Sequence, residues 1–327
     1  MSDAKVRPPC ANPLLKLLCM KKIFVLWALC LGIAAQAQET YRFAERDTCS
    51  LYLDIYRPAA GSQTQLDSLD KPAIMYVFGG GFIMGERSHP WHLPWFRTLN
   101  ENGYTVVTVD YRLGMKGVKV GKGMSGALQA SDAFENAQQM GVEDVISAVT
   151  FLLEQKDSLG IDPYNMVISG SSAGAIISLA TEYALVSGRA KGLPEDFNFK
   201  GVMSFAGGII SNSGAPHFPK APCPILLLHG TADQAVQYKS MALFGKGIWG
   251  SSWLANDWKR AGYNNYCIYR FKDSTHDVAM YMEVLWDLEK TFLEQNVIRG
   301  HARSVDALVD DASLPHWMQI SLGDIYK

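Results

Sequence analysis

Short apolar runs rich in β-branched residues recur along the chain and are separated by longer polar or helical stretches. An alternating run over residues 51–56 predicts an early antiparallel strand, whereas continuous apolar runs are typical of strands buried on both faces. The continuous runs cover residues 72–78, 104–109, 165–169, 201–206, 223–230 and 266–271. Helical stretches lie between these runs, so the pattern predicts an α/β fold with a mostly parallel central sheet flanked by helices.

Two stretches depart from this repeated strand and helix pattern. Residues 114–141 are rich in Gly, Ala, Ser and Gln, and they precede a helical periodicity over residues 142–159. They predict an irregular connection, longer than most within compact domains, that lies over a site or is mobile. Residues 297–327 contain a polar stretch, which is followed by Trp317 and scattered aliphatic residues. Packing over the domain and contact with a partner are both open for this tail.

The first 37 residues resemble a secretory signal. Lys21 and Lys22 form a basic region, residues 23–34 an apolar region, and residues 35–37 a small-x-small cleavage site. Met20 directly precedes the lysine pair, so we expect that translation could begin there. Cleavage after Ala37 predicts an exported protein, periplasmic or secreted, whose catalytic domain spans residues 38–327. The apolar run is too short for a comfortable membrane span, so we expect no stable membrane insertion after cleavage.

Composition narrows the classes of function. The formal net charge of −2 provides no basic field for nucleic acid. After cleavage three cysteines remain, Cys49, Cys223 and Cys267, and their odd number and wide spacing argue against a disulfide framework or a CxxC metal site. One pair could still form a disulfide in an oxidising compartment, and the sequence does not indicate which.

A Gly-x-Ser-x-Gly motif stands at residues 170–174, between a predicted strand and a predicted helix. In this context the central serine occupies a strained turn that presents its hydroxyl above the edge of the sheet, and small residues two positions away allow the strand and helix to cross closely. The helix amino end also favours negative charge that develops nearby. The alternative is a chance turn in a glycine-rich chain. Ser172 is therefore a candidate nucleophile whose partners must be sought further along.

A serine nucleophile needs a base and an acid that orients the base, and both should follow later strands in the order Ser, Asp or Glu, His. Asp233 stands in the loop after the run 223–230, and His276 in the loop after the run 266–271. Asp273 and Asp277 are rival acids, but as close neighbours of His276 they are better suited to shaping its loop. His229, at a strand end, suits a packing or turn contact. Ser172, Asp233 and His276 thus form the predicted triad.

Three glycines, Gly79 to Gly81, follow the run 72–78, where backbone N–H groups can turn toward a ligand; a flexible turn is the simpler alternative. With these motifs in place, the chain resembles the α/β-hydrolase superfamily, close to small esterases of the hormone-sensitive-lipase-like and carboxylesterase groups. The resemblance rests on the segments Phe78-Gly79-Gly80-Gly81-Phe82, Asp110-Tyr111-Arg112-Leu113, Gly170-Ser171-Ser172-Ala173-Gly174, His229-Gly230-Thr231-Ala232-Asp233 and on His276.

The resemblance implies an oxyanion hole from the N–H groups of Gly80, Gly81 and Ala173, and structural roles for Asp110 and Arg112. It implies a serine carboxylic ester hydrolase that forms an acyl-enzyme and needs no metal or organic cofactor. Export suggests acetyl or feruloyl esters of plant carbohydrate as the small-molecule or carbohydrate substrate. An exported serine peptidase of the same fold and a non-catalytic binding protein are the alternatives.

The chain also departs from the family pattern. Phe78 stands where many relatives have His, which could alter how the glycine loop is braced, and Ser171 replaces the Glu of larger carboxylesterases. Four tryptophans could stack on sugar or aryl rings, although core packing explains an aromatic equally well. They are Trp91, Trp95, Trp249 and Trp253.

Overall fold

The computed structural model describes residues 38–59, 71–317 and 320–325. The predicted signal, residues 1–37, lies outside the described residues. A nine-stranded sheet has the order β1-β2-β4-β3-β5-β6-β8-β11-β12. Its strands are β1 (Gln38–Arg46), β2 (Cys49–Tyr56), β3 (Ala73–Val77), β4 (Val106–Val109), β5 (Met166–Ser171), β6 (Gly201–Phe205), β8 (Ile225–Gly230), β11 (Tyr266–Phe271) and β12 (Val305–Val309).

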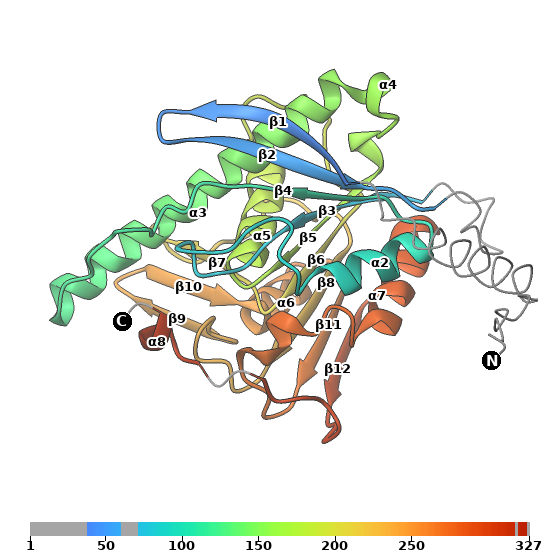
Figure 1. Ribbon diagram of the computed structural model, residues 1–327. Helices are drawn as coiled ribbons and strands as arrows, with labels where there is room; N and C mark the ends of the chain where they lie inside the picture. The colour runs from blue at the N-terminus through green and yellow to red at the C-terminus, as the bar shows by residue number, and fades with distance from the viewer. Residues whose placement is uncertain (1–37, 60–70, 318–319, 326–327) are drawn as a thin grey trace, which may run out of the picture. The chain divides into compact units, whose positions relative to one another are not determined.

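The sheet is parallel from β4 to β12, and β2 pairs antiparallel with both of its neighbours, β1 and β4. Every residue of the central strands β3, β5, β6 and β8 is buried, which accounts for their continuous apolar sequences. The predicted α/β fold with a mostly parallel sheet is therefore confirmed. Figure 1 shows the sheet with helices on both faces.

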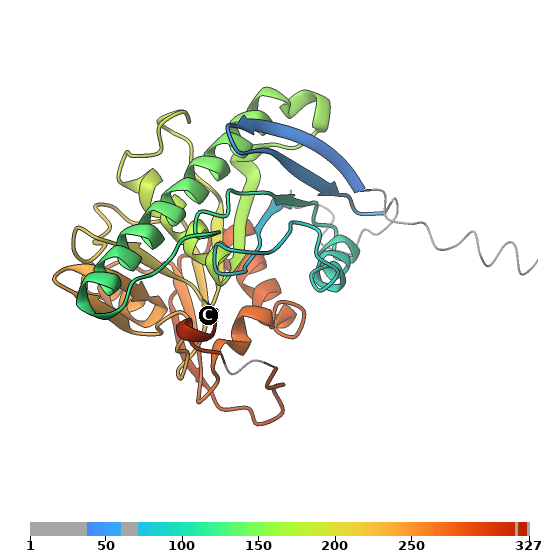
Figure 2. The ribbon, with the colours of Figure 1, turned by 60° about the vertical axis from the view of Figure 1, so that its left-hand side comes forward.

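Helices cover the two faces of the sheet (Figures 1 and 2). The long helix α3 packs on α5, and α5 in turn packs on the central strands. On the other face, α2 is tied to α7 by a hydrogen bond from Trp95 to Glu289. The helical elements are α2 (Leu93–Glu101), α3 (Gly123–Glu154), α4 (Lys156–Leu159), η1 (Pro163–Asn165), α5 (Ala173–Val186), α6 (Ser251–Arg260), η2 (His276–Met280), α7 (Trp286–Phe292), η3 (Leu293–Ile298) and α8 (Leu322–Ile325).

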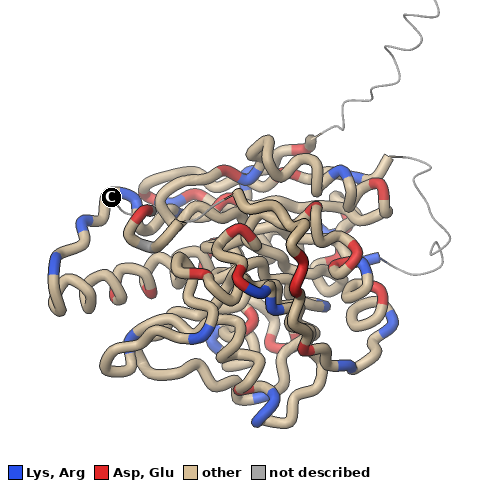
Figure 3. Tube along the Cα trace, turned by 90° about the horizontal axis from the view of Figure 1, so that it is seen from below, with Lys and Arg blue, Asp and Glu red and all other residues tan. Residues whose placement is uncertain are grey.

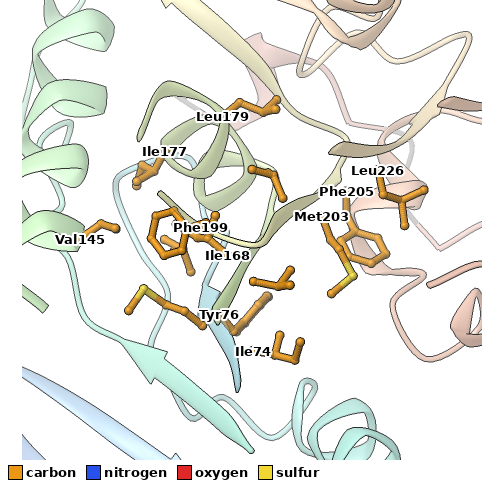
Figure 4. Close-up of a cluster of buried hydrophobic side chains, with 14 of the residues drawn as sticks. Ile74, Tyr76, Val145, Ile168, Ile177, Leu179, Phe199, Met203, Phe205 and Leu226 are labelled. Atoms are coloured by element: carbon orange, nitrogen blue, oxygen red, sulfur yellow. The ribbon is translucent and has the colours of Figure 1, made fainter. Parts of the chain in front are cut away.

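The hydrophobic core lies between these layers (Figure 4). Val145 of α3 and Ile177 of α5 are fully buried on one face of the sheet. On the other, the ring of Tyr76 packs against Trp95 and Phe96 of α2, with centroids 5.3 and 5.5 Å apart. Because both faces are apolar, the loops at the carboxyl ends of the strands are the parts left to carry a site.

The expectation of an irregular stretch over residues 114–141 is wrong for most of its length, because α3 begins at Gly123 and runs without a break to Glu154. Its first half is rich in Ala, which favours helix, but Gly126 and Ala137 on its buried side are small and give a weak apolar period. Gly141 is small because a Cβ there would lie 2.4 Å from Ile177 Cδ1 on α5. A close helix crossing therefore explains a glycine that resembled a loop signal.

A second, three-stranded sheet lies beside the carboxyl end of the main sheet, in the order β7-β10-β9. Its strands are β7 (Gly208–Ser211), β9 (Ser240–Leu243) and β10 (Lys246–Gly250). The sequence did not predict these short strands, nor β1 and β12. The C-terminal tail contributes β12, which extends the main sheet, and its Trp317 packs edge to face on Tyr281 at 5.6 Å. Part of the tail therefore packs on the domain.

Candidate active site

Ser172 lies at the turn between β5 and α5, in a backbone conformation that few residues other than glycine adopt. Its φ is 52° and its ψ is −116°. The crossing of strand and helix leaves no space at the flanking glycines: a Cβ on Gly174 would lie 2.0 Å from Val77 O, and one on Gly170 would lie 2.3 Å from the backbone of Gly174. The motif therefore forms the sharp turn that the sequence predicted.

Ser172, His276 and Asp233 are brought together at the carboxyl edge of the main sheet. His276 Nε2 lies 2.8 Å from Ser172 Oγ, and His276 Nδ1 lies 2.8 Å from Asp233 Oδ2. All three side chains are buried. Since the carboxylate can only accept, Nδ1 carries the hydrogen toward Asp233 and Nε2 is left to accept the proton of Ser172. The geometry is that of a serine nucleophile with its base and acid.

Both carboxylate oxygens of Asp233 are held by hydrogen-bond donors. Oδ1 accepts hydrogen bonds from the N–H groups of Ala235 and Val236 at 2.9 and 3.0 Å, while Oδ2 faces the two histidines His276 and His229. Burial alone would raise the pKa of Asp233, but hydrogen bonds from His229 and His276, and their charge, outweigh it and hold the pKa well below its usual range. Asp233 therefore stays ionised while His276 gains and loses a proton.

His229 is a second histidine in contact with the acid of the triad. It is fully buried, and its Nε2 lies 3.0 Å from Val236 O and 3.2 Å from Asp233 Oδ2. Both are acceptors, so Nε2 must carry a hydrogen. Nδ1 lies 2.8 Å from the hydroxyl of Ser251. The sequence predicted a turn contact for His229, which the bond to Val236 confirms, but it did not predict the contact with Asp233.

The rival acids lie elsewhere in the loop of His276. The Asp277 carboxylate accepts a hydrogen bond from Thr275 Oγ1 at 2.8 Å at the start of η2. Asp273 is exposed, with a φ of 57°, and its N–H bonds to Thr231 Oγ1 at 2.9 Å. His276 Nδ1 instead pairs with Asp233, which agrees with the assignment made from the sequence.

The glycine run forms a tight turn that approaches the Ser172 turn closely. Gly80 and Gly81 have φ values of 121° and 62°, and Gly81 borders the same pocket as Ser172 and Ala173. A Cβ on Gly79 would lie 3.2 Å from Ser172 Cβ. Of the three residues predicted to supply N–H groups, Gly81 and Ala173 border the pocket of the nucleophile, with Ala173 at the first position of α5, and Gly80 directly precedes Gly81 in the turn.

Phe78 braces this glycine turn through aromatic packing. Its ring stacks on Tyr111 with centroids 4.4 Å apart, and the Tyr111 hydroxyl donates to Phe78 O at 3.0 Å. Asp110 and Arg112, on either side of Tyr111, are structural as expected: Asp110 pairs with Arg87 at 2.7 Å, and Arg112 with Asp144 at 2.9 Å. The segment therefore supports the turn rather than entering the site.

Ser171 links the nucleophile turn to the loop of the base. Its Oγ donates to Ala279 O at 2.6 Å, and Ala279 belongs to η2, which begins at His276. The sequence marked Ser171 only as a departure from larger carboxylesterases. Ala279 lies far from Ser171 in the sequence and reaches it only through the fold, so no local sequence pattern could have identified this contact.

A pocket of about 390 Å³ opens above Ser172. Its walls come from the first half of α3, from the loop after Asp233 and from the β9–β10 hairpin, and most of its side chains are apolar. Leu128 and Phe134 of α3 line it together with Met241 and Ile248 of the hairpin. The ion pair between Asp132 and Lys246, at 2.5 Å, ties these two walls together.

Two of the four tryptophans considered for ring stacking belong to the core. Trp95 and Trp249 are buried, so core packing accounts for them. Trp91 is exposed and packs edge to face on Trp317 at 5.6 Å, and Trp253 is partly buried against the core. The three cysteines Cys49, Cys223 and Cys267 are unpaired.

The fold and the site together define an α/β hydrolase with a serine–histidine–aspartate constellation. The sequence profile of the carboxylesterase family matches residues 28–211, which is more than half of the chain, so the protein belongs to that family. Among curated relatives, lipase 2 of Moraxella sp. (strain TA144) is 25% identical over 182 residues, 55% of this chain and 37% of the relative. The chlorogenic acid esterase of Aspergillus niger is 26% identical over 167 residues, 51% of this chain and 27% of the relative.

The chain thus matches well under half the length of these curated relatives. Among solved structures, a thermophilic esterase from Thermogutta terrifontis aligns with a TM-score of 0.54 over 81% of this chain and 95% of that chain, at 21% identity. This likeness supports the α/β-hydrolase fold. Within the described residues, no helix is long and apolar enough to cross a membrane, and no group of three or more His, Cys, Asp or Glu side chains could hold a metal ion.

Proposed function

We propose that the protein is a serine carboxylic ester hydrolase with Ser172 as nucleophile, His276 as base and Asp233 as the acid that orients it. The observation that carries the proposal is the pair of 2.8 Å contacts that joins the three side chains, of which Ser172 lines an apolar pocket. Membership of the carboxylesterase family supports the same reaction. A peptidase or a binding role has no comparable support.

The reaction follows from the hydrogen positions. His276 Nε2 takes the hydroxyl proton as Ser172 Oγ bonds to the ester carbonyl carbon, and the resulting oxyanion is held by the N–H groups of Gly80, Gly81 and Ala173. The bond to the alcohol oxygen then breaks, and that oxygen takes the proton from His276. Water, deprotonated by His276, then attacks the acyl carbon. The bond to Ser172 Oγ breaks, the acid is released, and Oγ takes the proton back from His276. Asp233 stays a carboxylate and stabilises each imidazolium.

The pocket supports an apolar acyl group larger than acetyl. Its walls are mostly aliphatic and aromatic, and an acetyl group would leave most of the 390 Å³ unfilled. Of the two acyl groups expected from the sequence, this favours the feruloyl type, and medium-length aliphatic chains fit the same chemistry. Each methylene removed from water contributes about 0.8 kcal/mol, so kcat/KM should rise by up to about fourfold per methylene until the pocket is full.

The proposed localisation is outside the cytoplasm, because the first 37 residues have the pattern of a secretory signal. A relative 28% identical over 176 residues is named secreted lipase 1, from Botryotinia fuckeliana, which supports export. Plant carbohydrate esters would be available to an exported enzyme. Amino-terminal sequencing of the mature protein should begin at Gln38, and an intact amino terminus in the cell fraction would contradict export.

The test is hydrolysis of p-nitrophenyl acetate, butyrate, hexanoate and octanoate, methyl ferulate and acetylated xylan. Wild type is compared with Ser172→Ala and with the exposed control Ser158→Ala. We expect rates to rise from acetate to the longer or aromatic acyl groups, and Ser172→Ala to lose at least about 1,000-fold while the control is unchanged. Equal rates in Ser172→Ala and wild type, with folding verified by circular dichroism, would refute the nucleophile. A preference for acetate would refute the acyl assignment.

A further inference from the structure

The mouth of the pocket is bordered by two exposed segments, residues 116–125 and residues 239–246, which we call the rim. The first leads into α3 and the second forms the β9–β10 hairpin. Each position of the first segment is exposed, and so is each position of the second except Lys246. Figures 1 and 2 both place the amino end of α3 beside the hairpin. The pocket lies between the two walls, which meet through the Asp132–Lys246 ion pair.

The rim gathers hydrophobic side chains that the described chain leaves in solvent. Single exposed hydrophobic residues are normal on a protein surface, but clusters of them mark contact surfaces. Of the eleven large hydrophobic side chains exposed in the described residues, six lie in the rim. They are Val118, Val120, Met124, Met241, Leu243 and Phe244.

The rim also carries charge of one sign. Five lysines and no acidic residue occur in its two segments, although the whole chain has a net charge of −2. The lysines are Lys116, Lys119, Lys122, Lys239 and Lys246. In Figure 3 the stretch that leads into α3 carries basic positions and no acidic ones. The rim is therefore both apolar and basic, in contrast to the rest of the molecule.

Phe244 has a backbone conformation and a degree of solvent exposure that are both unfavourable for phenylalanine. Leu243 pairs with Lys246, so Phe244 and Gly245 form a two-residue hairpin turn, and their φ values are 51° and 79°. Two positive φ values indicate a type I′ turn, for which Asn-Gly is the preferred sequence. Phe244 instead leaves 81% of its surface exposed at the tip. A large aromatic side chain held outward at such a cost points to a partner outside the chain.

We propose that the rim binds an anionic lipid surface, with its apolar side chains entering the headgroup layer and its lysines pairing with the headgroups. Apolar side chains flanked by basic ones are the composition that binds such interfaces. A second copy of the chain is a poorer partner, because a symmetric interface would bring the same basic segments face to face, with Lys246 alone of the five lysines paired to an acid of the described chain, Asp132. The pocket opens between the rim segments, so an ester in the bound surface would enter it directly.

This proposal goes beyond ester hydrolysis and does not depend on it, because binding can be measured with an inactive protein. Ser172→Ala is sedimented with vesicles of phosphatidylcholine mixed with phosphatidylglycerol, and separately with vesicles of phosphatidylcholine alone. We expect binding to the anionic vesicles, much weaker binding to the neutral ones, and loss of binding at high salt. Hydrolysis assays on wild type remain a separate test of the catalytic residues.

Variants outside the pocket lining test the rim itself. Each lysine near an anionic surface contributes about fivefold, so Lys116→Gln, Lys119→Gln and Lys122→Gln together should weaken binding about 100-fold. Phe244→Asn should weaken it at least about tenfold while raising the unfolding midpoint, since asparagine suits the turn. The exposed control Leu308→Asn, on β12, should leave binding unchanged.

Three results would overturn the proposal. Equal sedimentation with anionic and neutral vesicles, or equal binding by the rim variants and the Leu308 control, would remove the rim from lipid binding. A dimer in analytical ultracentrifugation that Phe244→Asn converts to a monomer would identify the rim as an interface between copies instead.

Discussion

Glu289 of α7 is a carboxyl group buried without an ionic partner among the described residues. Trp95 Nε1 donates to its Oε2 at 2.7 Å, and its Oε1 has no hydrogen-bond partner in the described chain. Burial raises the pKa of Glu289 well above its ordinary value of 4.5, and the single bond from Trp95 lowers it only in part. Over a range of pH above 4.5 the folded protein therefore holds a proton that the unfolded chain releases.

This difference makes stability depend on pH. Below about pH 4.5 both the folded and the unfolded state carry the proton, so Glu289 does not change how the free energy of unfolding varies with pH. Above that value the unfolded state binds fewer protons, so wild type loses about 1.4 kcal/mol of unfolding free energy per pH unit until the folded pKa is reached. Glu289→Gln removes the titration and keeps an acceptor for Trp95. Its stability relative to wild type should therefore rise with pH at about that rate.

The measurement is urea unfolding followed by tryptophan fluorescence at a series of pH values from acidic to neutral, for wild type, Glu289→Gln and the exposed control Glu283→Gln. The difference between Glu289→Gln and wild type should widen as pH rises, whereas the control should run parallel to wild type. A difference that stays constant with pH would refute the reasoning, because it would mean that Glu289 does not hold its proton in the folded state.

Three further substitutions test the site. His229→Leu should lower kcat by about tenfold, because Asp233 would lose a donor that helps to hold it toward His276. His217→Leu, at an exposed histidine, should leave kcat unchanged, and an unchanged kcat in His229→Leu would contradict a positioning role for that residue. Ser171→Ala should lower the free energy of unfolding by about 1 kcal/mol, because η2 loses its hydrogen bond to the nucleophile turn. The same variant should lower kcat with little change in KM. An unchanged kcat would contradict this link. Gly174→Ala should lower the free energy of unfolding, measured in the same way, by more than about 3 kcal/mol, because its Cβ would clash with Val77 O. A variant as stable as wild type would show that the strand and helix can separate.

The predicted triad could be assembled from the sequence because its geometry follows from strand ends. Ser172, Asp233 and His276 each stand just after an apolar run, and parallel strands place their carboxyl ends at one edge of the sheet. The structure brings the three side chains within hydrogen-bond distance, as that reasoning requires. Residue type and position after a strand were sufficient, with no knowledge of side-chain direction.

Contacts that depend on how a loop curls back could not be predicted in this way. His229 contacts Asp233 where the loop after β8 curls back and brings Val236 O to the histidine ring. Ser171 contacts Ala279 where η2 lies beside the end of β5. The first half of α3 was missed for a different reason. Its buried side is made of small residues, so hydrophobic periodicity was weak although helix propensity was high.

The walls of the pocket are the least predictable part of the site, and this has a consequence for specificity. The triad lies on strand ends of the main sheet, but Leu128, Phe134 and Met241 come from the start of α3 and from a hairpin of the second sheet. These elements are joined by the Asp132–Lys246 pair, whereas the hydrogen bonds that align Ser172, His276 and Asp233 are made by residues of other elements. Changes in the hairpin can therefore alter which acyl group is accepted while the hydrogen bonds of the triad stay intact, so catalysis and acyl preference are separable in this protein.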